Sequence, residues 1–547
     1  MTIPHLRRIG AGIATAAAAA LVLSACAAGG SASTGAASAS AKPVDGGDLT
    51  FALANDPITL NPTALGSGND TLYIERQLFD SLTEQDPKTG KIIPGLATKW
   101  QANADATQFT FTLRTGVTFS DGTPLTAAVV KANFDDIVAN ATKAVNAVTA
   151  LPGYAGTTVV DDSTVTVAFA KPNGAFPQAA SSVALALLSP KSLAIPFDDR
   201  ATGKGLSGTG PFTLESYTKN TSVVLKKRAD YAWAPDDYAN RGAAHLDSVT
   251  FKIVPEAGVR TGGLTSKQFD AVGGVLPQDI ATLKTQKSGL IIRPNPGIAF
   301  GLTAYAKPGS ILSDEKVRTA LLTAIDRKAV QESALTPDFK VATSVLAANT
   351  PGWVDLGEKL TTDQKATQKA LDAAGWKKGS DGIREKDGKR LTLNLGYISN
   401  FNPNQSIVEL IQQQLKQVGV EVKVWTGTVP QYLAQSSAGA FDLAYGNLSR
   451  ADGDVLRTQF LNTLPSNTVK GYTDPTLQQL LLGQLATADQ QKRNEIAQQA
   501  GERIIELGYY IPVVELTTVL GTAPNVHGIV LGGDSRLGSL VDAYKTK

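Results

Sequence analysis

The stretch that decides the fold is FTFTLRTGVTFSDGTPLTA, residues 109–127. Its first five residues alternate large apolar side chains with threonine, which predicts a half-buried β-strand. Asp121-Gly122 is typical of a tight turn, because glycine adopts positive φ without a steric cost. Thr126 is a residue type that caps helix N-termini, and the residues after it favour a helix to about residue 138. The stretch therefore predicts a strand, a turn and a helix in succession.

The rest of the chain adds elements of both kinds. Residues 159–167 predict a hairpin, and Ser313 is expected to cap a helix. Residues 391–395 and 420–424 predict two strands, joined by a helix whose apolar stripe runs over residues 407–418. Strand, helix and strand at this spacing are typical of a βαβ unit, which implies a parallel pairing. The sequence therefore indicates the α/β class.

Residues 1–25 predict a secretory signal peptide. His5, Arg7 and Arg8 give a basic start, and residues 9–23 are uncharged and mostly apolar. The four residues Leu23-Ser24-Ala25-Cys26 resemble the lipobox of bacterial lipoproteins. This resemblance implies that the Cys26 sulfur receives a diacylglyceryl group and that cleavage makes Cys26 the new N-terminus.

Cys26 is the only cysteine of the chain. A thiolate is the side-chain nucleophile that such a lipidation needs. A plain signal-peptide cysteine and an uncleaved membrane anchor are the alternatives. Residues 26–45 are dominated by Gly, Ser and Ala, which cannot bury enough apolar surface to fold, so they predict a flexible tether.

The composition argues against several classes of function. The 547 residues include 51 Lys and Arg against 49 Asp and Glu, a balance unlike that of a nucleic-acid-binding surface. No disulfide or thiolate metal site is available beyond Cys26, and only His245 and His527 follow the signal. The motifs of serine hydrolases, zinc proteases and P-loop NTPases are missing from the sequence. We therefore expect no enzyme, no metal and no cofactor, although paired carboxylates for glycoside chemistry remain open.

Five sequence blocks resemble one family when they are taken in order. They match family 5 of the extracellular solute-binding proteins, the oligopeptide-, dipeptide- and nickel-binding components of ABC importers. The similarity runs from about Gly46 to the C-terminus. The chain departs from the family pattern at Ala128-Val129 and at Ala304-Tyr305, where many members have an acidic residue and an Asn. The blocks are Leu96-Ala97-x-x-Trp100, the opening stretch, Gly208-Thr209-Gly210-Pro211-Phe212, Asp314-x-x-Val317-Arg318-x-Ala320-Leu321-x-x-Ala324-Ile325-Asp326-Arg327, and Ala373-Ala374-Gly375-Trp376 with Asp381-Gly382-Ile383-Arg384.

This resemblance implies a bilobal periplasmic-binding-protein fold of type II, in the large three-domain form of the oligopeptide binders. A hinge and a ligand cleft would lie between the two lobes. The length of the chain after the tether is enough for about three domains. The expected boundaries are residues 46–80, 208–305 and 515–547 for lobe I, 81–207 for an extra domain packed on lobe I, and 306–514 for lobe II.

The resemblance implies a substrate-binding lipoprotein of an ABC importer, which captures a solute outside the membrane and delivers it to membrane permease subunits. An oligopeptide or dipeptide is the favoured solute. A sugar or other small organic solute, a sensory lipoprotein and an exported hydrolase are the alternatives, and scarce histidine disfavours nickel. We expect a monomer that is lipid-anchored outside the cytoplasm, on a periplasmic membrane face or a Gram-positive surface, with no nucleic-acid partner.

Residues 441–460 contain the main candidate for ligand binding. In the family's oligopeptide binders, an A-D-Y segment near here supplies an Asp that pairs with the peptide's α-amino group. Ala451-Asp452 matches its first two residues, but Gly453 replaces the aromatic. A cationic amine in a closed cleft needs a desolvated anionic partner. The alternative is that Asp452 and Asp454 form a turn or a helix N-cap.

Loops after predicted strands supply the other candidates. Tyrosine and tryptophan combine a flat contact surface with a polar tip, which suits varied ligands. Each of these side chains has core packing as its alternative role. The candidates are Asn69, Asn400, Phe401, Trp425, Tyr432, Tyr445 and Asn447.

Overall fold

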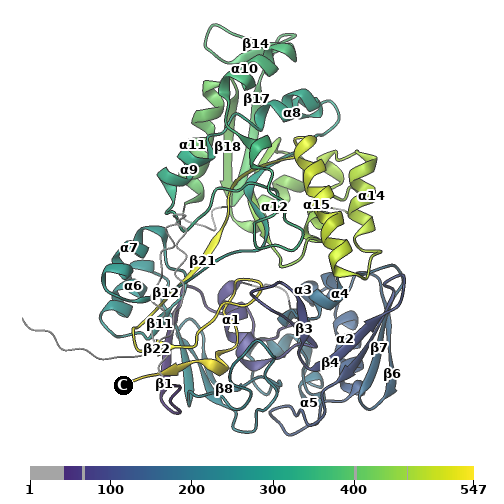
Figure 1. Ribbon diagram of the computed structural model, residues 1–547, viewed down its shortest axis with the longest axis vertical. Coiled ribbons are helices and arrows are strands. Elements are labelled where there is room, and N and C mark those ends of the chain that lie inside the picture. Colours follow the sequence, from purple (N-terminus) through teal and green to yellow (C-terminus); the bar gives the residue numbers. More distant parts are fainter. Residues whose placement is uncertain (1–41, 65–67, 399–402, 465) are drawn as a thin grey trace, which may run out of the picture. The chain divides into compact units, whose positions relative to one another are not determined.

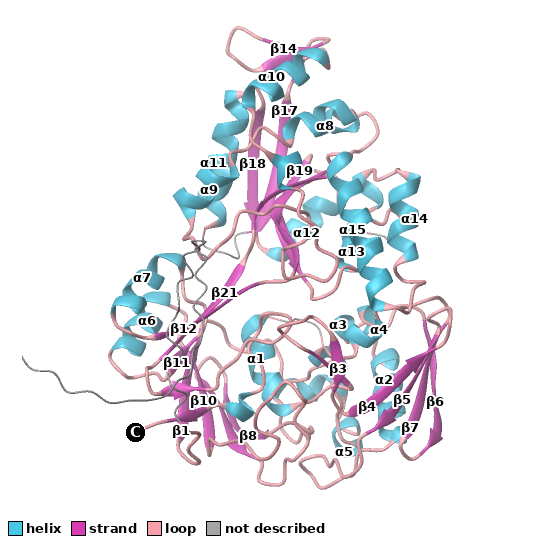
Figure 2. Ribbon diagram, in the orientation of Figure 1, coloured by secondary structure: helices cyan, strands magenta, loops and turns pink. Residues whose placement is uncertain are grey.

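The computed structural model describes residues 42–547 apart from 65–67, 399–402 and 465. Cys26, the expected signal peptide, most of the expected tether, and Asn400 and Phe401 lie outside the described residues. Residues 43–547 form a single compact unit. Within the described part of the chain, no helix is both long and apolar enough to cross a membrane. Three sheets, each with its own buried apolar core, carry the fold (Figures 1 and 2).

A seven-stranded mixed sheet combines distant parts of the chain. Its central strand β1 pairs in parallel with β10 and β11, and the other pairings are antiparallel. Helices α1 (Asn69–Leu78), α6 (Ala257–Thr265) and α7 (Pro277–Thr285) contact this sheet. In spatial order its strands are β12 (Gly289–Pro294), β21 (Thr517–Thr522), β11 (Ala271–Val272), β1 (Asp48–Leu53), β10 (Ser248–Ile253), β9 (Ser222–Lys227) and β8 (Phe212–Thr218).

A five-stranded sheet forms the second body. Helix α11 (Asn404–Gln417) joins β17 to the parallel strand β18, which confirms the predicted βαβ unit. Its strands are β18 (Glu421–Gly427), β17 (Thr392–Ile398), β19 (Leu443–Ser449), β13 (Gly297–Ala304) and β20 (Tyr510–Val514). Other helices of this part include α8 (Glu315–Leu321), α9 (Arg327–Ala334), α10 (Gln364–Ala373), α14 (Pro475–Gly483) and α15 (Gln490–Glu506).

The N-cap of α8 differs from the expected one. Asp314, not Ser313, accepts a hydrogen bond from the backbone N–H of Lys316 at 2.9 Å. Ser313 lies in the short turn before the helix, where its hydroxyl donates to the Ser310 carbonyl at 2.6 Å. The hydroxyl is therefore engaged upstream, and the carboxylate one residue later takes the capping position.

The opening stretch of the sequence folds as predicted. A four-stranded antiparallel sheet contains β4 (Ala97–Ala102), β5 (Gln108–Leu113), β7 (Thr164–Phe169) and β6 (Tyr154–Asp161), the last two forming the predicted hairpin. Thr126 caps α2 (Ala127–Ala139), because its side chain accepts from the Val129 N–H at 3.4 Å. The blue strands β4–β7 stand together at the lower right of Figure 1.

The remaining helices and strands are short. They are β2 (Thr83–Gln85), β3 (Ile92–Pro94), α3 (Val145–Thr149), α4 (Phe176–Ala179), α5 (Pro190–Leu193), β14 (Lys377–Lys378), β15 (Arg384–Lys386), β16 (Lys389–Arg390), α12 (Val429–Ser437), α13 (Val455–Phe460), β22 (Val526–His527) and β23 (Tyr544–Lys545).

Two segments cross side by side from the seven-stranded to the five-stranded sheet. One joins β12 to β13 and the other joins β20 to β21, and the Asn295 N–H donates to the Leu516 carbonyl at 2.7 Å. Strand β13 pairs with β19 and β20, so the chain changes sheets near residues 294–297 rather than at 305. The expected domain boundaries otherwise stay a proposal, in which the seven-stranded part is lobe I and the five-stranded part lobe II.

The arginines of the 314–327 block tie helices to loops. Arg318 donates to the Leu507 and Leu312 carbonyls at 2.9 and 2.8 Å, and Arg327 donates to the Pro512 carbonyl at 2.6 Å. Both side chains are buried. Burial lowers the pKa of Arg327 to about 10, so it stays charged at neutral pH. These motif residues therefore hold the scaffold together.

The glycines of the 208–212 block pack directly on the end of α1. A Cβ on Gly208 would lie 2.2 Å from the Leu78 carbonyl oxygen, and one on Gly210 would lie 2.6 Å from that of Gln77. The Thr209 carbonyl between them accepts from the Trp233 indole N–H at 3.0 Å. Only glycine allows the two backbones to approach this closely.

Gly210→Ala is accordingly expected to lower the free energy of unfolding by about 3 kcal/mol, at the upper end of typical overpacking costs. The neighbour is backbone, so it cannot rotate away from the added methyl group. The matched control is Gly258→Ala in α6, where an added Cβ meets nothing within 4 Å. Denaturant unfolding of both variants measures the difference, and equal stabilities would show that the approach to α1 is relaxed at little cost.

Candidate ligand-binding cleft

Three cavities meet beside the crossing segments. Their volumes are about 550, 950 and 390 Å³. Asn447 of β19 lines all three, while Asn69, Asn295 and Leu516 line the first two. We name them the arginine cavity, the central cavity and the tyrosine pocket after the residues described below. The shared lining residues place the three cavities side by side, next to the segments that join the two sheets, and we call them together the cleft.

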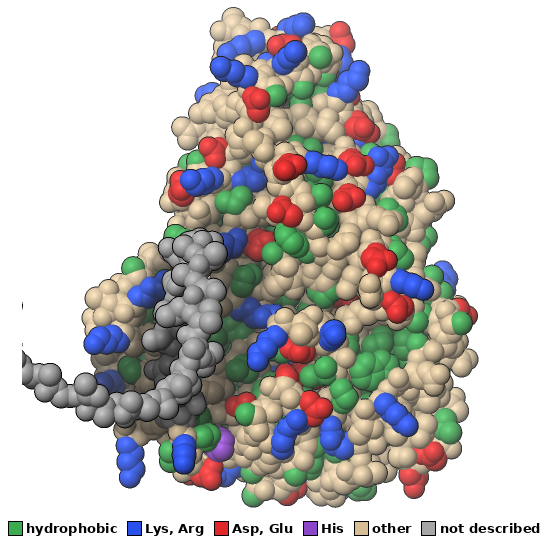
Figure 3. Space-filling view, viewed as in Figure 1, with side chains coloured by type: hydrophobic (Ala, Val, Ile, Leu, Met, Phe, Trp, Pro, Cys, Tyr) green, Lys and Arg blue, Asp and Glu red, His purple; other side chains and the backbone are tan. Residues whose placement is uncertain are grey.

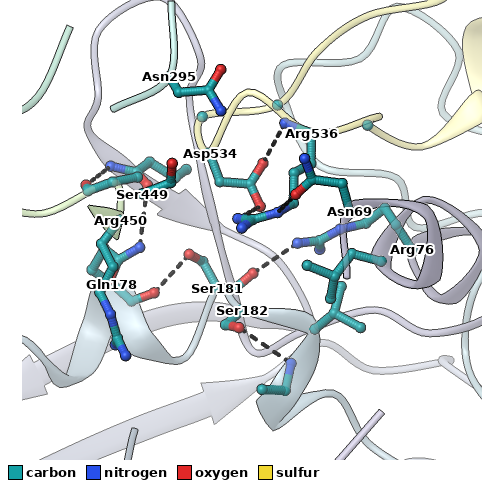
Figure 4. Close-up of a pocket in the computed structure, with 18 of the residues that line it drawn as sticks. Asn69, Arg76, Gln178, Ser181, Ser182, Asn295, Ser449, Arg450, Asp534 and Arg536 are labelled. Atoms are coloured by element: carbon teal, nitrogen blue, oxygen red, sulfur yellow. Dashed lines mark hydrogen bonds and ion pairs between the residues drawn. The ribbon is translucent and has the colours of Figure 1, made fainter. Parts of the chain in front are cut away.

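The arginine cavity is the largest cluster of charge in the cleft (Figure 4). Arg76 of α1 donates to Glu84 at 3.3 Å and to the Ser181 carbonyl at 3.0 Å. Arg536 pairs with Asp534 at 3.3 Å. These two guanidinium groups are therefore already neutralised and hold the wall of the cavity in place.

Arg450 is different from its neighbours in the arginine cavity. It follows β19, and its exposed side chain makes no hydrogen bond or ion pair with the described residues. In Figure 4 the Arg450 side chain extends from the end of the strand, on the side of the view opposite Arg76. A guanidinium presents a planar fork of donors that matches a carboxylate in a bidentate pair. Arg450 is therefore the group of this cavity that is free to bind an anion.

The central cavity carries carboxylates. Asp56 accepts a hydrogen bond from the Tyr217 hydroxyl through Oδ2 at 2.6 Å, while its buried Oδ1 has no partner among the described residues. Asp70 accepts from the backbone and side chain of Asn55, both at 2.8 Å, and burial raises its pKa. The unpartnered Oδ1 of Asp56 is thus the candidate acceptor of this cavity.

The tyrosine pocket lies beside the five-stranded sheet, and residues of β13, β19 and β20 line it. Tyr305, Tyr432, Tyr445 and Tyr510 line it together with Lys470. Burial raises the pKa of each tyrosine, so all four hydroxyls are neutral.

Four of the candidates from sequence line the cleft: Asn69, Tyr432, Tyr445 and Asn447. Asn69 accepts from Arg536 at 3.0 Å. Trp425 is not among the described lining residues and packs against Phe441, with ring centroids 5.4 Å apart. A ligand role for each of these residues stays a prediction.

Asp452 lies beneath helix α15. Its Oδ1 accepts from Arg493 Nη2 at 2.6 Å and from the Asp454 N–H at 2.8 Å. The hydrogen bond from the Asp454 N–H closes a turn, which was the alternative role expected for Asp452. Asp452 is buried and does not line the three cavities among the described residues. The ligand role of Asp452 stays a prediction. The structure shows that this carboxylate forms a buried ion pair with Arg493.

Sequence reasoning missed four cleft residues. Arg450 stands two positions before Asp452 in the same candidate segment, but only the aspartate matches the family's A-D-Y segment. Asn295 lies between Pro294 and Pro296, which is a recognisable mark of a chain crossing. Asp56 and Lys470 carry no local pattern, because their burial depends on distant segments.

The fold and cleft define a class of protein, the two-lobed binding proteins that hold a solute between their lobes. The family model described as bacterial extracellular solute-binding proteins, family 5, middle, matches residues 91–470. The chain belongs to this family. It is therefore an extracytoplasmic solute-binding protein of an ABC importer, a transport receptor rather than an enzyme.

Individual relatives bind different solutes. The dipeptide-binding protein of Escherichia coli K12 is 27% identical over 493 residues, covering 84% of this chain and 88% of its own length. The nickel-binding periplasmic protein of the same strain is 25% identical over 511 residues, covering 88% of this chain and 93% of its own length. Among solved structures, NikA from Brucella suis with Fe(III)-EDTA has a TM-score of 0.78 at 22% identity, covering 91% of this chain and 100% of NikA. AppA from Bacillus subtilis with a nonapeptide has a TM-score of 0.72 at 21% identity, covering 92% of this chain and 100% of AppA. These two structures share the fold.

Proposed function

We propose that the solute is a short peptide. The observation that carries this proposal is the separation of two unpaired opposite charges in the cleft. Arg450 lines the arginine cavity, and Asp56, whose Oδ1 has no partner among the described residues, lines the central cavity. A peptide has a carboxylate at one end and an ammonium at the other, so it satisfies both groups at once.

The residues shared by the two cavities fit the middle of such a ligand. Asn69, Asn295 and Asn447 present side-chain amides, which donate and accept hydrogen bonds as peptide groups do. An uncharged sugar would satisfy the amides but leave Arg450 and Asp56 without partners. Relatives named for dipeptides, oligopeptides and glutathione support a peptide as well.

A metal complex has less support from the residues. Within the described part of the chain, no group of three His, Cys, Asp or Glu side chains is placed to hold a metal ion. The visible face in Figure 3 mixes acidic and basic side chains, so no single sign of charge dominates it.

Membrane attachment belongs to the same proposal. Cys26 carries two acyl chains, residues 26–45 act as a tether, and the monomeric body delivers its peptide to permease subunits. Tethering raises the effective concentration of the receptor at the permease.

Native mass spectrometry of the chain from Ala41 tests the solute class, because residues 43–547 form one compact unit. We expect a retained mass that fragments as a peptide, and rebinding of added peptides after unfolding and refolding. A retained compound that is not a peptide, or no binding to a peptide library, would favour a sugar or another small solute.

The role of Arg450 has its own test with trialanine and its C-terminal amide. Removing a charged hydrogen-bond partner costs roughly 1.5–3 kcal/mol, so the amide should bind the native protein at least about tenfold more weakly. In Arg450→Gln the two peptides should bind alike. Arg390→Gln, which alters an exposed arginine of lobe II, is the matched control. A difference between the peptides that persists in Arg450→Gln would place the carboxylate elsewhere.

A further inference from the structure

The tyrosine pocket contains a buried cation without an anionic partner. Lys470 is 7% exposed, and its Nζ donates to Asn467 Oδ1 at 2.9 Å. It is the one charged side chain among the described residues that line the pocket. Residues 399–402 and 465, which lie outside the described part, contain no Asp or Glu. An ammonium has three donors, so one neutral acceptor leaves it poorly compensated.

A second unsatisfied group lines the same pocket. Tyr445 is 2% exposed, and its hydroxyl has no hydrogen-bond partner among the described residues. Its ring is fixed by stacking on Phe300, with centroids 5.4 Å apart. A buried hydroxyl without a partner is destabilising unless a ligand or water completes it. An ammonium and a hydroxyl thus both offer donors to whatever occupies the pocket.

The pocket is shaped for a side chain that branches from the cleft. Its volume of about 390 Å³ exceeds that of several waters at about 30 Å³ each. Asn447 and Leu448 line both this pocket and the arginine cavity, so the pocket lies beside the path of the proposed peptide. Tyr305 provides an aromatic wall 5.6 Å from Lys470 Nζ, measured to its ring centroid. Tyr305 also belongs to the pair at which the chain departs from its family's pattern.

We propose that the tyrosine pocket receives an acidic side chain of the bound peptide, whose carboxylate pairs with Lys470 Nζ and accepts from the Tyr445 hydroxyl. This inference rests on the peptide function proposed above and narrows it to peptides that contain aspartate or glutamate. Burial lowers the pKa of Lys470 to about 8, so the ammonium is charged at neutral pH. A neutral side chain leaves that charge uncompensated, and a cationic one meets a like charge.

Titration calorimetry with two sets of tripeptides tests the proposal. One set carries glutamate and the other glutamine. In each set the residue stands at each of the three positions in turn, with alanine at the other two. We expect glutamate to bind at least tenfold more tightly than glutamine at one position, with little difference at the other two. Lys470→Met should abolish that difference while the glutamine peptides keep their affinity. Tyr445→Phe should weaken only the glutamate peptide, by a few-fold, because the ring is retained.

Lys328→Met is the matched control, since Lys328 of α9 is 77% exposed. It should retain the full preference for glutamate. Equal affinities for the two peptides at all positions, or a preference that persists in Lys470→Met, would overturn the proposal while leaving the peptide function intact. Binding of none of the tripeptides would overturn the peptide function, and this proposal with it. Thermal unfolding checks that Lys470→Met is folded. If it is not, the affinities of the glutamate and glutamine peptides for the native protein decide whether the proposal holds.

Discussion

Asp452→Asn is expected to lower the free energy of unfolding by about 3–5 kcal/mol, the usual cost of removing one partner of a buried ion pair. Asp452 and Arg493 lie 2.6 Å apart, and both side chains are 6% exposed. The substitution leaves the Arg493 charge buried without its counter-ion. Denaturant unfolding of the chain from Ala41 measures the loss. The peptide affinity of the folded fraction should stay close to that of the native protein.

The controls separate a structural role from a ligand role. Asp381→Asn breaks an exposed pair with Arg390 and should cost at most about 1 kcal/mol. Replacing both partners, as Asp452→Asn with Arg493→Met, should recover part of the stability, because no uncompensated charge remains. If Asp452→Asn instead keeps its stability and loses peptide binding, the ligand role inferred from the sequence is correct and the ion pair is secondary.

Elements built from local interactions could be predicted from the sequence. The strand, turn and helix of residues 109–127 follow from side-chain alternation, one glycine and the cap at Thr126, all within a few residues of one another. The βαβ unit around α11 was predictable for the same reason. Family resemblance then extended these local predictions to the whole fold.

Contacts between residues far apart in the sequence could not be predicted from local patterns. Strand β1 lies beside β10 and β11, some 200 residues away, and no local pattern specifies those neighbours. Residues 297–304 lie inside the segment expected for lobe I, but as strand β13 they pair within the five-stranded sheet. The partner of Asp452 is a helix residue 41 positions later. Burial of this kind is decided by tertiary packing, which a single sequence does not display.

The recognisable motifs and the cleft are made of different residues. Gly208, Gly210, Arg318 and Arg327 are fixed by close backbone approach or by carbonyl acceptors. None of them lines the three cavities among the described residues. A family pattern of this type identifies the scaffold and leaves the ligand open. The nature of the solute has to be argued from unpaired groups in the cleft.

Cys26→Ala is expected to abolish incorporation of a labelled fatty acid into the protein. Cys26 is the only thiol in the sequence, so no second residue supplies the nucleophile for a thioether. One acyl chain gives only marginal membrane binding, with an association constant of about 10⁴ M⁻¹, whereas two chains anchor a protein stably. The native chain should therefore partition into the detergent phase of a cloud-point separation, and its intact mass should include a diacylglyceryl group.

The comparison chain that starts at Ala41 should partition into water, and Ser31→Ala should be labelled like the native protein. Cleavage and anchoring are separated by the intact mass, because a chain that starts at Cys26 without added lipid would indicate a plain secretory signal. A full-length mass that still carries residues 1–25 would indicate an uncleaved anchor instead. Either result would contradict lipidation of Cys26.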